Sequence, residues 1–123
     1  MWIMLHDAFF SIVRKDAPAG NLLVRARRPD DISKVFGRRI SIEQDSRGDY
    51  GWRARIHEDD VATVLKTELQ SIKYPNFKDS VTDKPLHDAY MQVWLAMSKI
   101  QDPPPYSGYT ARAVPSRKPR RKK

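Results

Sequence analysis

Apolar and polar residues alternate along several short stretches in the first half of the chain. Residues 22–28 are the clearest case, because leucine, valine and alanine occupy one face of the expected strand and arginines occupy the other. We expect a hairpin that turns near residues 6–8, and we expect Ile40 and Ile42 to face the core. The pattern predicts further strands over residues 2–5, 9–14, 39–44 and 51–56.

Three other stretches show the three-to-four-residue spacing of a helix. A short helix is expected between Pro29 and Gly37, and a longer one follows the acidic residues 58–60 and ends near Ile72. Asp83 can cap a third helix, which runs up to the proline run at residues 103–105. The apolar stripe of this third helix is Leu86, Tyr90, Val93, Met97 and Ile100.

The predicted order of elements is β-β-β-α-β-β-α-α. Helices that cover one face of an antiparallel sheet make an α+β fold. Residues 22–72 form a ferredoxin-like β-α-β-β-α unit that lacks a last strand, the N-terminal hairpin can fill or extend that edge, and the third helix is an addition. We expect one globular domain over residues 1–108 and a disordered basic tail over residues 109–123.

The net charge of +8 is distributed unevenly along the chain. Residues 1–101 carry sixteen Lys/Arg against fourteen Asp/Glu, whereas residues 102–123 carry seven Lys/Arg against Asp102 alone. A basic arm of this kind binds the phosphates of a nucleic acid in a salt-dependent way, whatever the nucleotide sequence. The alternative is that it serves only as a solubilising tail. The candidate contacts in this arm are Arg117, Lys118, Arg120, Arg121, Lys122 and Lys123.

Arginines also recur on one face of two predicted strands. If the strands at residues 22–28 and 51–56 lie in one sheet, their arginines project together and can meet phosphates or the carboxylates of a partner. The alternative is a solvated face in which Glu43 and Asp49 form local ion pairs with them. The four candidate residues are Arg25, Arg27, Arg53 and Arg55.

The connection between the second and third helices combines aromatic residues with charges. Lys73, Tyr74, Phe77 and Lys78 lie within a few residues of one another around Pro75. Loops that carry such residues often form binding surfaces. The alternative is an ordered connector whose two aromatic rings close the core beneath the helices.

Catalytic, metal and redox motifs are missing from the sequence. It contains no cysteine, no glycine-rich phosphate loop and no histidine pair at metal-ligand spacing, so we expect no catalytic residue, no metal and no cofactor. His6, His57 and His87 each have a carboxylate close by in sequence. The chain also shows no leader and no membrane-spanning run, which favours a cytoplasmic protein without a membrane partner.

Several segments occur together that are specific in combination. They are MWI (1–3), DAF (7–9), SIV (11–13), LLVRAR (22–27), YPNFKDSV (74–81), HDAY (87–90), VW (93–94) and PPYSG (104–108). In this combination the chain resembles a family of small uncharacterised bacterial or phage-borne proteins. The resemblance implies a bacterial cytoplasmic protein and no particular activity, and the basic tail departs from it.

Three functional hypotheses follow. The first is a non-enzymatic binding module whose partner is nucleic acid or a nucleoprotein complex, bound through the basic sheet face and the basic tail. The alternative is a small protein inhibitor or adaptor, for example a phage-type anti-defence factor. The third is a small hydrolase that uses His87 and a carboxylate. The oligomeric state is left open by the sequence.

Overall fold

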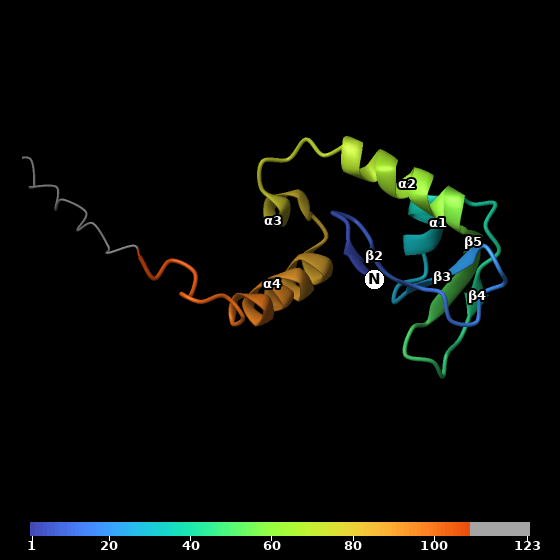
Figure 1. The fold of residues 1–123 in the computed structure, drawn as a ribbon, viewed down its shortest axis with the longest axis horizontal. Helices are drawn as coiled ribbons and strands as arrows, with labels where there is room; N and C mark the ends of the chain where they lie inside the picture. The colour runs from blue at the N-terminus through green and yellow to red at the C-terminus, as the bar shows by residue number, and fades with distance from the viewer. Residues whose placement is uncertain (109–123) are drawn as a thin grey trace, which may run out of the picture. The chain divides into compact units, whose positions relative to one another are not determined.

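The computed structural model describes residues 1–108 (Figure 1). The chain divides into two compact units, Met1–Met91 and Gln92–Lys123. The basic tail predicted over residues 109–123, with its candidate contacts, lies outside the described residues. The elements are β1 (Trp2–Met4), β2 (Phe9–Val13), β3 (Asn21–Ala26), α1 (Asp31–Phe36), β4 (Glu43–Gln44), β5 (Trp52–His57), α2 (Glu58–Gln70), α3 (Phe77–Ser80) and α4 (Lys84–Ser98).

A five-stranded antiparallel sheet forms the centre of the first unit. Its strand order is β1-β2-β3-β5-β4, so the predicted N-terminal hairpin extends the sheet beside β3. β3 and β5 pair along their whole length, from Asn21 opposite His57 to Ala26 opposite Trp52. Helices α1 and α2 lie over one face of the sheet (Figure 1). The predicted α+β class is therefore confirmed, while the ferredoxin-like comparison stays a prediction.

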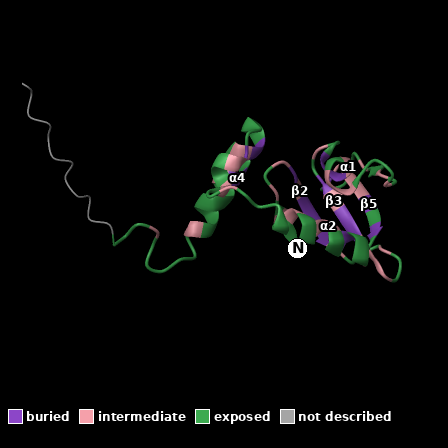
Figure 2. Cartoon of the chain, turned by 90° about the horizontal axis from the view of Figure 1, so that it is seen from above, coloured by how far each residue is buried: buried purple, intermediate pink, exposed green. Residues whose placement is uncertain are grey.

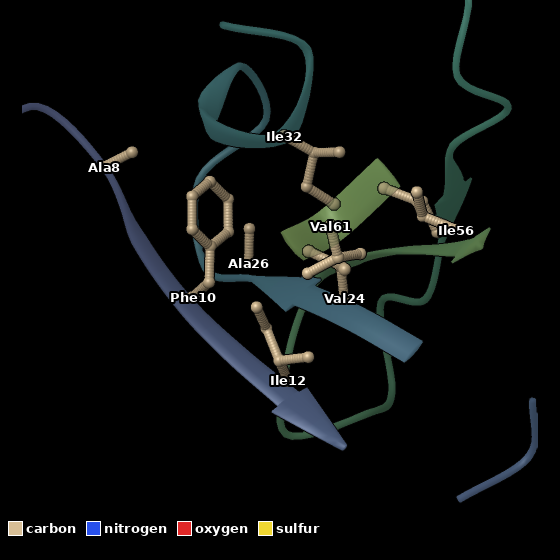
Figure 3. Packing of buried hydrophobic residues seen from close by; sticks show 9 residues of the cluster. Ala8, Phe10, Ile12, Val24, Ala26, Ile32, Ile56 and Val61 are labelled. Atoms are coloured by element: carbon tan, nitrogen blue, oxygen red, sulfur yellow. The ribbon is translucent and has the colours of Figure 1, made fainter. Parts of the chain in front are cut away.

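The core lies between the sheet and these two helices. Strand alternation places Ile12, Val24 and Ala54 on the helix side, because they lie opposite one another on three neighbouring strands. Figure 3 shows Ile32 of α1 and Val61 of α2 pointing into the same cluster. Burying one large apolar side chain contributes about 1.5–3 kcal/mol, so this cluster holds the sheet and both helices together.

A second, smaller cluster forms around Phe9, which points away from Phe10 on β2. Phe9 and Phe77 pack against buried Val81, Leu86 and Tyr90. The rings of Phe77 and Tyr90 are stacked, with centroids 5.6 Å apart and planes 25° apart. The first turns of α4 and the short helix α3 are thereby fixed to the hairpin end of the sheet.

The strand predicted over residues 39–44 is wrong in extent. Only Glu43 and Gln44 pair with β5, opposite Arg53 and Trp52. Ile40 and Ile42 nevertheless pack against the core as expected. Their alternation reports which side chains are buried, and a chain can bury alternate side chains without pairing its main chain.

In the second unit, the last turns of α4 carry exposed apolar side chains. The helix ends at Ser98, before the proline run at residues 103–105 that was expected to end it. Val93, Trp94 and Met97 are exposed, as Figure 2 shows along this helix. The predicted stripe is therefore buried only at Leu86 and Tyr90, which belong to the first unit.

Candidate functional site

The sheet brings the four predicted arginines onto one face. Arg25 lies directly opposite Arg53 across β3 and β5, and Leu23 lies opposite Arg55. This face is the one that turns away from α1 and α2, as the alternation predicts. Arg27 follows β3 immediately and lies, like Arg25, over the ring of Tyr50.

Carboxylates and main-chain oxygens of the sheet and its loops bind these arginines. Arg53 pairs with Asp45 at 3.2 Å, Arg55 with Glu43 at 2.9 Å and Arg25 with Asp49 at 3.9 Å. Arg27 donates to the main-chain oxygen of Asp49 at 2.9 Å, and Arg55 donates to that of Asp16 at 2.8 Å. The ion pairs with Glu43 and Asp49 are those of the alternative prediction, so three carboxylates offset four guanidinium groups on this face.

Tyr50 also takes part in this arrangement. It is only 4% exposed, and the guanidinium carbons of Arg25 and Arg27 lie 4.6 and 4.2 Å from its ring centroid. Cation–π contacts of this kind hold guanidinium groups in place. The ring is covered by the protein's own arginines, so it offers no open surface on which a nucleic-acid base could stack.

The central connection has two different parts. Phe77 lies half-buried in the second cluster, and Asn76 caps α3 by accepting from the main-chain N–H of Lys78 at 3.0 Å. Lys73 and Lys78 are exposed and have no ion-pair partner among residues 1–108. No hydrogen bond, ion pair or ring contact in that range joins this connection to the arginines of the sheet. The two predicted sets of site residues thus belong to separate surfaces.

A hollow of about 690 Å³ opens beside β1. One wall is the strand itself, and the opposite wall is the last turns of α2 with the chain that follows it. The polar groups at the hollow are those of His6, Glu68, Ser71, Lys73 and Ser80, and the apolar groups are Ile3, Met4, Leu5, Leu65, Leu69, Ile72 and Tyr74. Its volume falls in the range of roughly 300–1,000 Å³ that is usual for sites that enclose ligands.

β1 is also an edge strand of the sheet, with β2 on one side only. Main-chain hydrogen bonds join the N-terminal segment to β2 on that side. Met1 and Ile12 exchange two hydrogen bonds of 2.7 and 2.8 Å, and the N–H of Leu5 donates to the main-chain oxygen of Ala8 at 2.8 Å. In an antiparallel ladder alternate residues face the partner. The N–H and C=O groups of Trp2 and Met4 therefore point to the open edge.

The turn of the β1–β2 hairpin is held by polar contacts from three directions. Asp31, only 2% exposed, accepts from the main-chain N–H of Phe9 at 3.2 Å and pairs with Arg28, which also donates to the main-chain oxygen of Asp7 at 3.2 Å. The hydroxyl of Tyr90 lies 2.9 Å from the main-chain oxygens of both Leu5 and Ala8 and shares its one donated proton between them. β1 is thus presented on a fixed scaffold.

The pKa values of Tyr90 and Arg28 are both shifted by their surroundings in this network. Burial raises the pKa of the Tyr90 hydroxyl well above its ordinary value, and the nearby Asp31 carboxylate raises it further. Burial alone would lower the pKa of Arg28, but hydrogen bonds and charge interactions with Asp31 and Asp83 outweigh it, so that pKa is raised. Both groups therefore keep their neutral-pH protonation state, Tyr90 neutral and Arg28 charged.

Of the three histidines, His6 lies in the turn itself, with Nε2 3.8 Å from Asp7 Oδ2, and the other two lie outside this network. His87 Nδ1 is 3.4 Å from Asp88 Oδ1, and His57 Nδ1 caps α2 by accepting from the N–H of Asp59 at 3.1 Å. Within the described part of the chain no cluster of three His, Asp or Glu side chains could hold a metal ion. The hydrolase hypothesis based on His87 stays a prediction.

The hollow and the open edge were not anticipated from the sequence. One signal was present: residues 2–5 are all apolar, whereas a strand with one buried face alternates. No family model, no curated protein and no solved structure matches the chain. None of the helices over residues 1–108 is long and apolar enough to cross a membrane.

Proposed function

We propose that this chain is a non-enzymatic protein-binding module, of the adaptor or inhibitor kind, whose interaction surface is β1 with the hollow beside it. The observation that carries the proposal is the open edge of β1. Edge strands are normally protected from pairing with other chains by short length, charges, prolines or bulges. β1, which reads Trp-Ile-Met, is short but carries no charge, proline or bulge.

Exposed apolar side chains surround this edge. Trp2 is 77% exposed and Leu69 is 70% exposed, and Met4 and Ile72 are also exposed. Single exposed apolar residues are ordinary, but Met4, Leu69 and Ile72 line the same hollow, and apolar side chains gathered at a hollow mark an interaction site. Trp is also among the residues that contribute most to binding at protein interfaces.

The charges at this surface favour a protein partner over a polyanion. Glu68 and Lys73 supply one charge of each sign to the lining of the hollow, and the remaining lining is neutral when His6 is neutral. Phosphate groups would therefore find no net positive charge there. On the arginine face, ion pairs already offset most of the charge.

A matched pair of variants tests the proposal. The full-length protein is used for affinity purification from the cells that express it, with nuclease treatment, and Leu69→Asp is compared with Ile100→Asp. Both residues are large, apolar and exposed, and only Leu69 lines the hollow. We expect a nuclease-resistant protein partner that Leu69→Asp loses and Ile100→Asp retains. A partner that both variants retain would place the function elsewhere on the chain.

Nucleic acid is a second candidate partner, through the basic residues after the described region. Residues 1–108 carry sixteen Lys/Arg and fifteen Asp/Glu, a net charge of +1, whereas residues 109–123 carry seven Lys/Arg and no acid, a net charge of +7. Such a segment binds phosphates without reading sequence. In the same purification, loss of all partners on nuclease treatment would support this candidate.

A further inference from the structure

We infer that the surface at β1 takes an extended segment of another protein, which adds to the sheet as a sixth strand and places alternate apolar side chains in the hollow. This inference rests on the proposed protein-binding function and specifies how the partner binds. Strand addition is a known mode of peptide recognition, in which the main chain supplies affinity and pockets for alternate side chains supply specificity.

The main-chain groups of the edge identify this class of partner. Trp2 and Met4 each present one N–H donor and one C=O acceptor to the open side, two residues apart. An extended polypeptide repeats its own donors and acceptors at the same two-residue spacing. A helix or a folded side-chain surface does not, because a helix uses its main-chain groups internally.

The side-chain directions fit the same partner. Ile3 points to the helix side of the sheet, where it packs at the margin of the core and lines the hollow. A residue of the added strand opposite Ile3 points to the same side and therefore meets Leu69 and Ile72. Its neighbours on the added strand point to the other side, next to the exposed side chains of Trp2 and Met4. The structure thus selects a segment with apolar residues at every second position.

A proline substitution on the edge tests the main-chain contact. Met4→Pro removes one outward N–H without removing an inward hydrogen bond, and proline is tolerated on edge strands at such positions. The control Met4→Ala shortens the same side chain and keeps the N–H. The probe is a phage-displayed library of linear twelve-residue random peptides, selected on the full-length wild-type protein. The best binder is then synthesised and measured by fluorescence anisotropy.

We expect binders with apolar residues at alternate positions, whose affinity falls about tenfold or more with Met4→Pro, because a lost hydrogen bond leaves a desolvated carbonyl unpaired. Met4→Ala removes the side-chain contact but keeps the N–H, so Met4→Pro should bind at least about tenfold more weakly than Met4→Ala. Circular dichroism checks that each variant keeps its fold. If Met4→Pro unfolds, Trp2→Pro with the control Trp2→Phe takes its place.

N-methylated versions of the selected peptide give a test that does not depend on any protein variant. In an added strand only every second N–H of the peptide faces β1. N-methylation of the residues whose N–H faces β1 should block binding, and N-methylation of the residues between them should not. Equal effects of both sets would overturn strand addition, as would binders with apolar residues three and four apart.

Two further outcomes separate this inference from the proposed function. A cellular partner that is lost with Leu69→Asp but retained with Met4→Pro would show that the hollow binds proteins by side chains alone, which overturns strand addition and keeps the function. Concentration-dependent dimers of the wild type that Met4→Pro abolishes, seen by analytical ultracentrifugation, would replace the inferred segment with a second copy of this chain.

Discussion

Removal of a single hydroxyl group tests how the hairpin that carries β1 is held. Tyr90→Phe keeps the ring that stacks on Phe77 and deletes only the group that donates to Leu5 and Ala8. Tyr90 is 8% exposed, so water does not readily replace the lost donor. The variant therefore isolates the hydrogen bond from the packing.

The magnitude follows from the other contacts of the two acceptors. The carbonyl oxygen of Ala8 also accepts from the N–H of Leu5 at 2.8 Å and keeps that bond in the variant. The carbonyl oxygen of Leu5 has no other partner among the described residues and is left unpaired. One unpaired, partly buried carbonyl costs about 1–2 kcal/mol of unfolding free energy. For a domain of this size the melting temperature falls by about 4–8 °C for each kcal/mol.

Urea denaturation followed by tryptophan fluorescence measures the change in unfolding free energy. Tyr74→Phe is the matched control, because its hydroxyl has no hydrogen-bond partner among the described residues, and it should change stability by less than about 0.5 kcal/mol. Hydrogen exchange at the Leu5 amide reports whether the hairpin end opens locally. If Tyr90→Phe is as stable as Tyr74→Phe, the hydroxyl does not hold the hairpin and the reasoning is refuted.

Three further predictions concern pH, the tail and the arginine face. The pKa of Tyr90 is raised in the folded state, so its contribution to stability is complete below its unfolded pKa of about 10 and is lost as the pH rises above that value. Denaturation measured between pH 9 and 12 should therefore show a loss of unfolding free energy at alkaline pH that Tyr90→Phe lacks. Deletion of residues 111–123 should leave the melting temperature within a few degrees of wild type, and a large drop would mean that the tail is docked. The deletion should also remove most salt-dependent binding to duplex DNA, as a titration at two salt concentrations would show. In the protein without this tail, replacing Arg27 and Arg53 with Gln should leave DNA binding unchanged and cost up to about 1 kcal/mol of stability; a shallower salt dependence would instead show that these arginines bind phosphates.

The strands were predictable where one face of the sheet is buried and the other is polar. Around Val24 and Ala54, apolar residues alternate with arginines, and this pattern fixed both the strand and the face. The alternation also predicted local ion pairs, because a sheet that places Arg55 on its outer face places Glu43 on the same face nearby. The same pattern failed at Ile40 and Ile42, whose burial comes from side-chain packing without strand pairing.

The central connection was predicted in part. Aromatic residues near a proline suggested either a binding loop or a core contact, and the structure places Phe77 in a core contact. The short helix α3 was missed, although Asn76 is a residue type that commonly caps helices. Exposed Lys73 and half-buried Tyr74 line the hollow, so the binding-loop interpretation stays a prediction for this half of the connection.

The proposed interaction surface could not be derived from the sequence because it depends on which strand lies at the edge of the sheet. Side-chain alternation says which face of a strand is buried and nothing about which strand is its neighbour. The apolar composition of β1 becomes informative only with the strand order. Trp-Ile-Met would be ordinary in a central strand, but at an edge it has no charge or proline to block pairing. The buried Asp31, the bound Arg28 and the Tyr90 hydroxyl all fix the turn next to this strand, which keeps the edge from fraying. We expect an edge that is rigidly held and carries no charge, proline or bulge to pair with another chain rather than to lose the strand, and the Met4→Pro comparison tests this expectation.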